Sequence, residues 1–339
     1  MKKTLKKMFT AGMIMIFGLL ISSCGGTDGN NARTADGRLK IAATTTFVGE
    51  TVARVGGEQV ELTVLLEPGQ NPHAYQPTPQ DLARVADARL LFVNGFQLEG
   101  FVDDLVASAG RSLQVVEVSE GIDPLLVSGD GHDHEHEEEA EHDHDEETGH
   151  DHQEEAGHEK KGSEFGQDPH VWFDPNNVIL WVDNVADALA EADPAHAEDY
   201  QQNAEAYRQE LLALDSWIRE TVAEIPSEDR KLVTDHTAFG YFVEEYGFQQ
   251  VGAVTPAPTT EAETSGKQLA ELIDLIRSEE VKAIFVGMDF DPTLSERVAE
   301  DTGVELVPLY FGSLTQGGNA DTYLEFMRYN VEAIVEALQ

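Results

Sequence analysis

Short apolar runs alternate with segments of helical periodicity, and this alternation constrains the fold more than any other feature of the sequence. Strands separated by helices of this length are typical of parallel α/β sheets. A long amphipathic helix over 194–224 divides the strands into two groups. We therefore predict an α/β fold with two lobes, 39–193 and 225–339, each a parallel sheet flanked by helices, joined by this long linking helix. The predicted strands lie at 39–44, 60–66, 90–93, 113–118, 231–235, 249–254, 283–286 and 305–309.

The first residues have the form of a secretory signal. Four lysines precede an apolar run over 8–21, and Ser22, Ser23 and Cys24 follow it. We interpret 1–23 as a lipoprotein signal peptide, Cys24 as the lipidated residue and 24–38 as a Gly/Asn/Asp-rich tether. A plain signal peptide or a retained signal anchor is the alternative. This predicts an extracytoplasmic lipoprotein anchored to a membrane, in the periplasm or on the outer face of the cytoplasmic membrane.

Residues 129–163, within the first predicted lobe, interrupt the α/β pattern. They are rich in His, Asp and Glu and nearly free of apolar side chains, so they cannot offset the entropy cost of ordering and predict a disordered loop. Such a loop could bind several divalent ions weakly, and a solvated acidic linker is the alternative. Its histidines are His132, His134, His136, His142, His144, His150, His152 and His158.

Charge and cysteine content narrow the possible ligands. The formal net charge of −42 argues against a nucleic-acid partner, because an acidic surface repels phosphates. Cys24 is the only cysteine, so a metal site in the mature chain must use nitrogen and oxygen ligands.

Four histidines lie outside the acidic loop: His73, His170, His196 and His236. All but His196 lie beyond predicted strands or beside turns, and ligands of open parallel sheets bind beyond the carboxyl ends of strands. His196 lies near the start of a charged helix, where a solvated side chain is expected. Position alone leaves two interpretations of the other three open, ordinary turn residues or a zinc site with imidazole ligands.

The sequence contains four separated stretches of distinctive composition: EPGQNPHAYQPTP (67–79), DPHVWFDP (168–175), VTDHTAFGYF (233–242) and TYLEFMRYN (322–330). Together they resemble the zinc and manganese solute-binding proteins of ABC transporters, the cluster A-I family. The resemblance covers 38–339 and implies that His73, His170 and His236 are metal ligands. The manganese branch commonly has glutamate as its third ligand, so a histidine at 236 favours Zn²⁺ as the transported ligand.

The resemblance also implies a role and partners. It predicts a monomer that is not an enzyme and that captures Zn²⁺ between its lobes. The zinc is then released to an ABC-type permease with its own ATPase subunit. Ligation needs neutral imidazoles, so affinity should fall steeply below about pH 6. The alternatives are a manganese-binding or adhesin-like member of the family, or a zinc hydrolase, although the chain has no HExxH motif.

One departure from the family concerns the fourth ligand. The family usually supplies an aspartate from the segment that here reads LYFGSL (309–314), where Gly312 stands at the aligned position. The fourth ligand is therefore open between water, Asp289, Asp291 and a histidine of the acidic loop. Asp235, next to His236, is either an orienting partner of that imidazole or a turn former.

Overall fold

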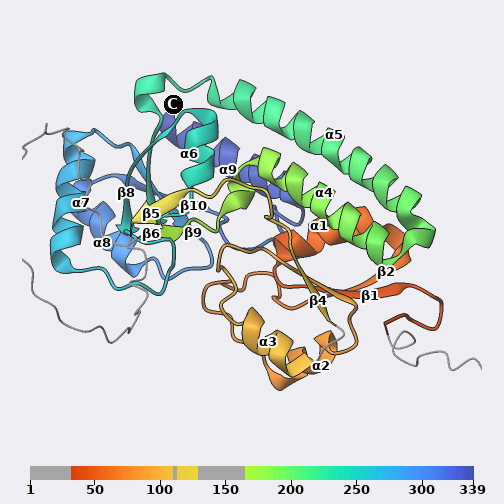
Figure 1. Cartoon of the computed structure of the whole chain (residues 1–339). Helices are drawn as coiled ribbons and strands as arrows, with labels where there is room; N and C mark the ends of the chain where they lie inside the picture. Colours follow the sequence, from red (N-terminus) through yellow and green to blue (C-terminus); the bar gives the residue numbers. More distant parts are fainter. Residues whose placement is uncertain (1–31, 110–112, 129–164) are drawn as a thin grey trace, which may run out of the picture.

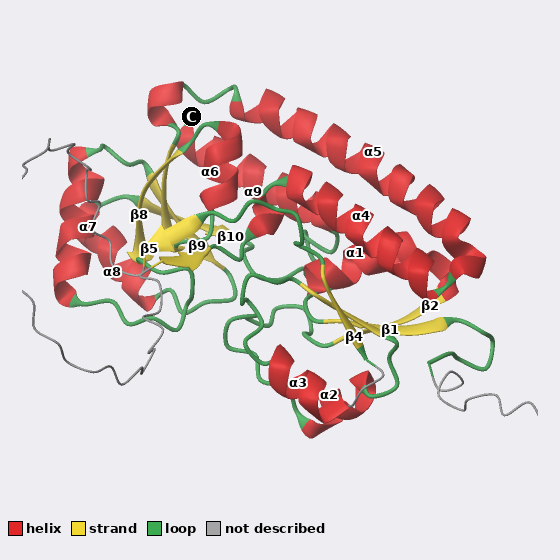
Figure 2. Ribbon diagram, viewed as in Figure 1, coloured by secondary structure: helices red, strands yellow, loops and turns green. Residues whose placement is uncertain are grey.

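The computed structural model describes residues 32–109, 113–128 and 165–339 (Figures 1 and 2). These residues form two four-stranded parallel sheets flanked by helices, with one long helix running along both (Figure 1). The predicted fold class is confirmed. The boundaries assigned to the two lobes remain predictions.

The sheet of the N-terminal lobe has the strand order β2-β1-β3-β4. Helices cover both faces of this sheet. Alternate residues of β1 point to opposite faces, and apolar residues on each face pack against a different set of helices. Ile41 packs in the core under α1 and α4, whereas Ala42 packs with residues of α2 and α3. The elements are β1 (Leu39–Ala43), α1 (Thr46–Gly56), β2 (Val60–Val64), α2 (Pro79–Val85), β3 (Leu90–Val93), α3 (Val102–Ala109) and β4 (Gln114–Glu117).

The sheet of the C-terminal lobe has the order β10-β9-β7-β8 and the same alternation. Phe285 of β9 joins the core shared with α6 and α9, and Ile284 packs against α7 and α8. The elements are β7 (Lys231–His236), α6 (Gly240–Tyr246), β8 (Gln249–Thr255), α7 (Gly266–Ser278), β9 (Ala283–Gly287), α8 (Thr293–Thr302), β10 (Glu305–Leu309) and α9 (Tyr323–Leu338).

Two long helices connect the sheets. Helix α4 (Pro175–Ala192) starts at Asp174, whose side chain accepts a hydrogen bond from the Asn176 amide, and Pro175 fits the first turn because it needs no N–H partner there. The predicted linking helix over 194–224 is interrupted near its start, since a 3₁₀ turn precedes α5 (Ala197–Val222). Helix α5 packs on α1 and α4 at one end and on α9 at the other.

The lobes share one continuous apolar core. Its centre is aromatic: the ring of Phe47 stacks on Trp172 with centroids 5.0 Å apart and meets Phe326 edge-on at 4.8 Å. Phe173 stacks on Phe239 of the C-terminal lobe at 4.0 Å. Each fully buried large side chain contributes roughly 1.5–3 kcal/mol, so this core holds the lobes firmly together.

Two local details differ from the sequence prediction. The helix expected over 236–246 begins only at Gly240, because His236 still pairs with Thr255 as the last residue of β7. An antiparallel pair, β5 (Leu126–Ser128) with β6 (Phe165–Gln167), was not predicted. Strands of three residues are too short to show a periodic pattern.

Several predicted segments lie outside the described residues: the signal peptide 1–23, Cys24 and the acidic loop 129–163 with its eight histidines. The end of the predicted tether is described, and there Arg33 pairs with Leu39 in a bridge and binds Asp193 at 2.8 Å. In the described part of the chain, no helix is both long enough and apolar enough to cross a membrane.

Candidate metal centre

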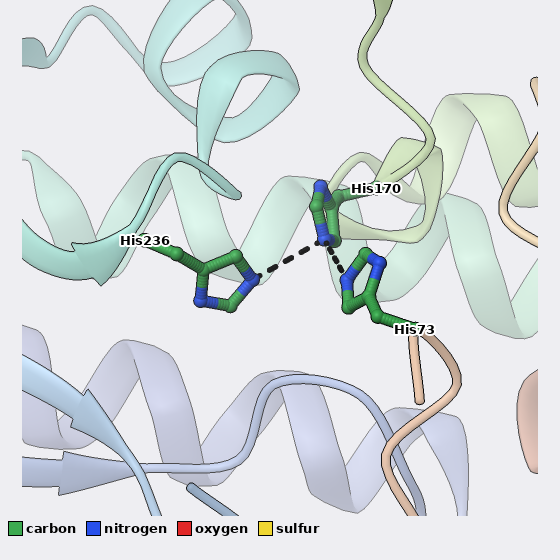
Figure 3. A group of neighbouring side chains, drawn as sticks. All are labelled: His73, His170 and His236. Carbon is green, nitrogen blue, oxygen red and sulfur yellow. Dashed lines mark hydrogen bonds between the residues drawn. The ribbon is translucent and has the colours of Figure 1, made fainter. Parts of the chain in front are cut away.

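Three histidines from distant parts of the chain meet at the junction of the lobes (Figure 3). His73 lies in the loop between β2 and α2, His170 follows β6, and His236 ends β7. The Nε2 atom of His170 lies 3.0 Å from Nε2 of His73 and 3.4 Å from Nε2 of His236. One ligand atom from each ring lies within 4.8 Å of the other two, which is close enough for all three to bind one ion.

Asp168 fixes the tautomer of His170. The Nδ1 atom of His170 lies 2.7 Å from Oδ1 of Asp168, and a carboxylate can only accept, so Nδ1 carries the proton and the Nε2 lone pair faces the centre. A Cβ on Gly240 would lie 2.6 Å from Oδ2 of Asp168, so the approach of α6 requires glycine. Burial raises the pKa of Asp168 to about 7, and a metal ion at the centre would favour the charged carboxylate, which is the form that accepts from Nδ1.

Asp235 does the same for His236. Its Oδ1 accepts from Nδ1 of His236 at 2.7 Å, and its Oδ2 accepts from the backbone N–H of Gly287 at 2.7 Å. This is the geometry of an orienting partner, the first of the two interpretations of Asp235. Gly287, which the sequence analysis missed, is confined by its neighbours, since a Cβ there would lie 2.3 Å from the Phe290 ring.

His73 is held through its backbone instead. Its N–H donates to Oδ1 of Asn71 at 2.9 Å, and Nδ2 of Asn71 donates to Oγ1 of Thr260 in the C-terminal lobe at 2.8 Å. The N–H of Gly69 donates to Oγ of Ser313 at 2.7 Å. The loop that carries His73 therefore spans from one lobe to the other.

Burial keeps the rings of His73 and His170 uncharged. Burial, with the neighbouring His170 and His236 rings, lowers the pKa of His73 to about 2. Burial also lowers the pKa of His170 well below its ordinary value, with His236 adding to the effect. Neutral imidazole is the form that binds metal, so the loss of affinity expected below about pH 6 moves to lower pH.

The proposed fourth ligands lie differently. The group of ligand atoms within 4.8 Å of one another includes neither Asp289 nor Asp291. Asp289 and Asp291 both line a cavity of about 390 Å³ together with Asp235 and His236. Asp291 is exposed, and its Oδ1 accepts from the N–H and hydroxyl of Thr293 at the start of α8.

His196 and several buried residues near the site have contacts that serve the fold. His196 lies apart from the site, half-exposed, and its Nδ1 binds Oδ2 of Asp193 at 2.7 Å. Trp172, Phe239 and Tyr241, which lie in the same two stretches as His170 and His236, are buried. The sequence analysis missed Asn94, whose buried amide donates to the Pro169 carbonyl at 3.0 Å and so supports the turn before His170.

Comparisons with known proteins match nearly the whole chain. The family model described as zinc-uptake complex component A, periplasmic (ZnuA), matches residues 41–337. The manganese-binding lipoprotein MntA of Halalkalibacterium halodurans is 32% identical over 336 residues, covering 98% of this chain and 99% of MntA. The iron-binding protein YfeA of Yersinia pestis is 29% identical over 326 residues, covering 95% of this chain and 93% of YfeA.

The fold also matches a solved structure. The periplasmic zinc binding protein TroA from Treponema pallidum aligns with a TM-score of 0.73 at 26% identity, covering 89% of this chain and 99% of TroA. These three proteins carry the names of three different metals. The metal of this chain must therefore be argued from its own ligand atoms.

Proposed function

This chain belongs to the zinc-uptake complex component A family, and we propose that it captures Zn²⁺ outside the cytoplasm and delivers it to an ABC-type importer. The convergence of three imidazole Nε2 atoms at the lobe junction is the observation that carries this proposal. His73, His170 and His236 are the proposed ligands. The ion is cargo, so the site must bind it tightly and also release it.

The ligand atoms favour zinc. Zinc binds imidazole nitrogen at about 2.0–2.1 Å in a tetrahedral shell, whereas manganese prefers carboxylate, carbonyl and water oxygens. Two of the three rings already present an unprotonated Nε2 because carboxylates hold their Nδ1 protons. A nitrogen-rich site of this kind supports zinc as the bound metal.

Manganese is the second candidate, because the 32% identical relative is named a manganese-binding lipoprotein. Competition between the two metals in one titration measures which of them the isolated site prefers. We expect Zn²⁺ to displace Mn²⁺ completely. Since nitrogen-containing sites generally bind zinc more tightly, the decisive result is the metal recovered with the protein from cells grown with both.

Membrane attachment and partners complete the proposal. We propose that Cys24 carries the lipid anchor of a monomeric extracytoplasmic protein, and that the partner is a permease with its ATPase subunit. A relative that covers nearly the whole chain is itself named a lipoprotein. Deleting the gene should produce a growth defect in low zinc that added zinc relieves. Normal growth in low zinc would favour the adhesin-like alternative.

The test of the site uses a protein without the acidic loop. Ser128 pairs with Phe165 across the β5–β6 ladder, so an Asn-Gly turn can replace residues 129–164 without changing either strand. Calorimetric titration at neutral pH should show one tight zinc site per chain in both the full protein and this variant. If the variant has lost all tight binding, the three histidines are not the capture site.

A further inference from the structure

Gly312 cannot be replaced by aspartate in the present arrangement of the site. A Cβ on Gly312 would lie 2.8 Å from Cδ of Pro72, the residue immediately before His73. This separation is shorter than side-chain carbons tolerate, so a larger residue at 312 would displace the loop that carries a proposed ligand. The position expected to supply the fourth ligand is thus closed to any side chain.

A carboxylate from the neighbouring strand occupies the space beside Gly312. Asp289 follows the end of β9, and Gly312 follows the end of β10. These two strands are paired in the sheet. A Cβ on Gly312 would lie 3.7 Å from Oδ2 of Asp289, which is van der Waals contact. Asp289 therefore places an acidic group next to the position where the side chain of residue 312 would begin.

One oxygen of this carboxylate has no protein donor. Oδ2 of Asp289 is buried and has no hydrogen-bond partner among the described residues. Buried polar atoms nearly always have a partner, so an unpaired carboxylate oxygen calls for a bound cation or water. Asp289 lines the same cavity as Asp235 and His236, and Asp291 lines it as well. Asp291 offers no such group, since its exposed carboxylate is engaged by Thr293.

We infer that Asp289 supplies the fourth metal ligand of this chain, in place of the aspartate that Gly312 replaces. The inference rests on the proposed function. The Asp289 oxygens lie outside the 4.8 Å group formed by the histidines. The inference therefore includes a turn of the Asp289 side chain toward the ion when the metal binds. The resulting shell is three neutral imidazoles and one carboxylate, which suits tetrahedral zinc and offsets part of its charge.

The test compares Asp289→Asn and Asp289→Ala with the control Asp291→Asn in the otherwise complete mature protein. Zinc affinity is measured by competition with a chelator of known affinity, and folding by circular dichroism. We expect Asp289→Ala to weaken zinc binding at least about as much as loss of an orienting partner, roughly 10–100-fold. Asp289→Asn should weaken it less than alanine, because an amide oxygen is a poorer ligand. Asp291→Asn should bind as the unchanged protein does.

A crystal structure of the zinc complex, with anomalous scattering at the zinc edge, decides the assignment directly. An Asp289 oxygen at about 2.0–2.2 Å from zinc is the expected result. Zinc held by the three histidines with water or another residue in the fourth position would overturn the assignment and leave the proposed function intact. Zinc bound elsewhere would overturn the proposed function itself.

Discussion

The two sides of the metal centre are built differently. His170 and His236 are almost fully buried, with 1% and 2% of their surface exposed, and a carboxylate holds each ring by its Nδ1 proton. His73 is less buried and comes from a loop. Among the residues that the structure describes, no carboxylate binds its ring. One side thus has rigid rings with a fixed tautomer, and the other has a ring whose position depends on its loop.

This difference indicates how the metal enters. The aromatic core runs through both lobes without a break, so a wide hinge opening would expose Phe47, Trp172 and Phe239 to water. The loop that carries His73 is tied to the C-terminal lobe by single hydrogen bonds, which are far weaker constraints. We expect the ion to meet the fixed pair first and the His73 loop to close on it.

The largest expected effect is from removing a ligand on the fixed side. His170→Ala removes one nitrogen and also leaves buried Asp168 without its ring partner, whereas His73→Ala leaves the fixed pair in place. Both variants should lose more zinc affinity than the roughly 10–100-fold that is typical when an orienting partner is removed. His170→Ala should bind zinc more weakly than His73→Ala does, by roughly tenfold or more. Chelator competition gives both affinities.

His196→Ala is the matched control for these variants, because His196 is also paired with an aspartate but lies outside the centre. It should leave zinc affinity unchanged. Equal losses for His170→Ala and His73→Ala would show that the two sides contribute alike and would remove the distinction.

The orienting carboxylates give the next largest effect. Asp168→Asn and Asp235→Asn keep the size of each side chain but let an amide nitrogen face Nδ1, which favours the wrong tautomer. Each should cost roughly 10–100-fold in zinc affinity. Neutron or NMR data on the ring protons test the cause, since Nδ1 of His170 and His236 should carry hydrogen in the unchanged protein. Full affinity in either variant would mean that packing alone fixes the rings.

The sequence predicted the framework better than the details of the site. The alternation of strand and helix patterns was enough to predict the two parallel sheets. Strand β9, for example, is buried along its whole length and reads as a continuous apolar run. Positions near strand ends and turns made the three histidines candidates, and the resemblance to the family implied that they are ligands. The roles of Gly287, Gly240 and Asn94 were missed, because each depends on a close approach between segments distant in sequence, which no local pattern records. Gly312 was noticed only as a departure from the family.

Acid should affect the site less than three ordinary histidines would predict. Three imidazoles with the ordinary pKa of about 6.5 would cost roughly 10⁴-fold in affinity between pH 7 and pH 5. Burial lowers the pKa of His73 to about 2 and that of His170 well below its ordinary value, so protons do not compete with zinc at these two rings in this range. Zinc affinity measured at both pH values should therefore fall by far less than the change expected for three ordinary histidines.

The same pKa shifts have a consequence for the metal-free protein. Below pH 6.5 the histidines of the unfolded chain bind protons, whereas the buried rings of His73 and His170 in the folded chain do not. The contribution of these two residues to the free energy of unfolding therefore falls as the pH falls. The His73→Ala variant should lose part of this dependence in metal-free thermal unfolding. In the zinc measurements at pH 7 and pH 5, a roughly 10⁴-fold loss of affinity would contradict both expectations, because it would show that all three rings titrate as exposed histidines do.

The smallest effect tests the loop side alone. Thr260→Val keeps the shape of the side chain but removes the hydroxyl that accepts from Asn71, the residue that holds the His73 backbone. A single hydrogen bond of this kind contributes about 1 kcal/mol, so zinc should leave about fivefold faster while circular dichroism stays unchanged. Thr259→Val is the control, because the Thr259 hydroxyl accepts from the backbone N–H of Glu261 within its own loop. Stopped-flow transfer of zinc to a chelator measures both release rates. Because the fixed pair is untouched in either variant, a faster release in Thr260→Val alone would locate the exit step at the His73 loop, and equal rates would place it elsewhere.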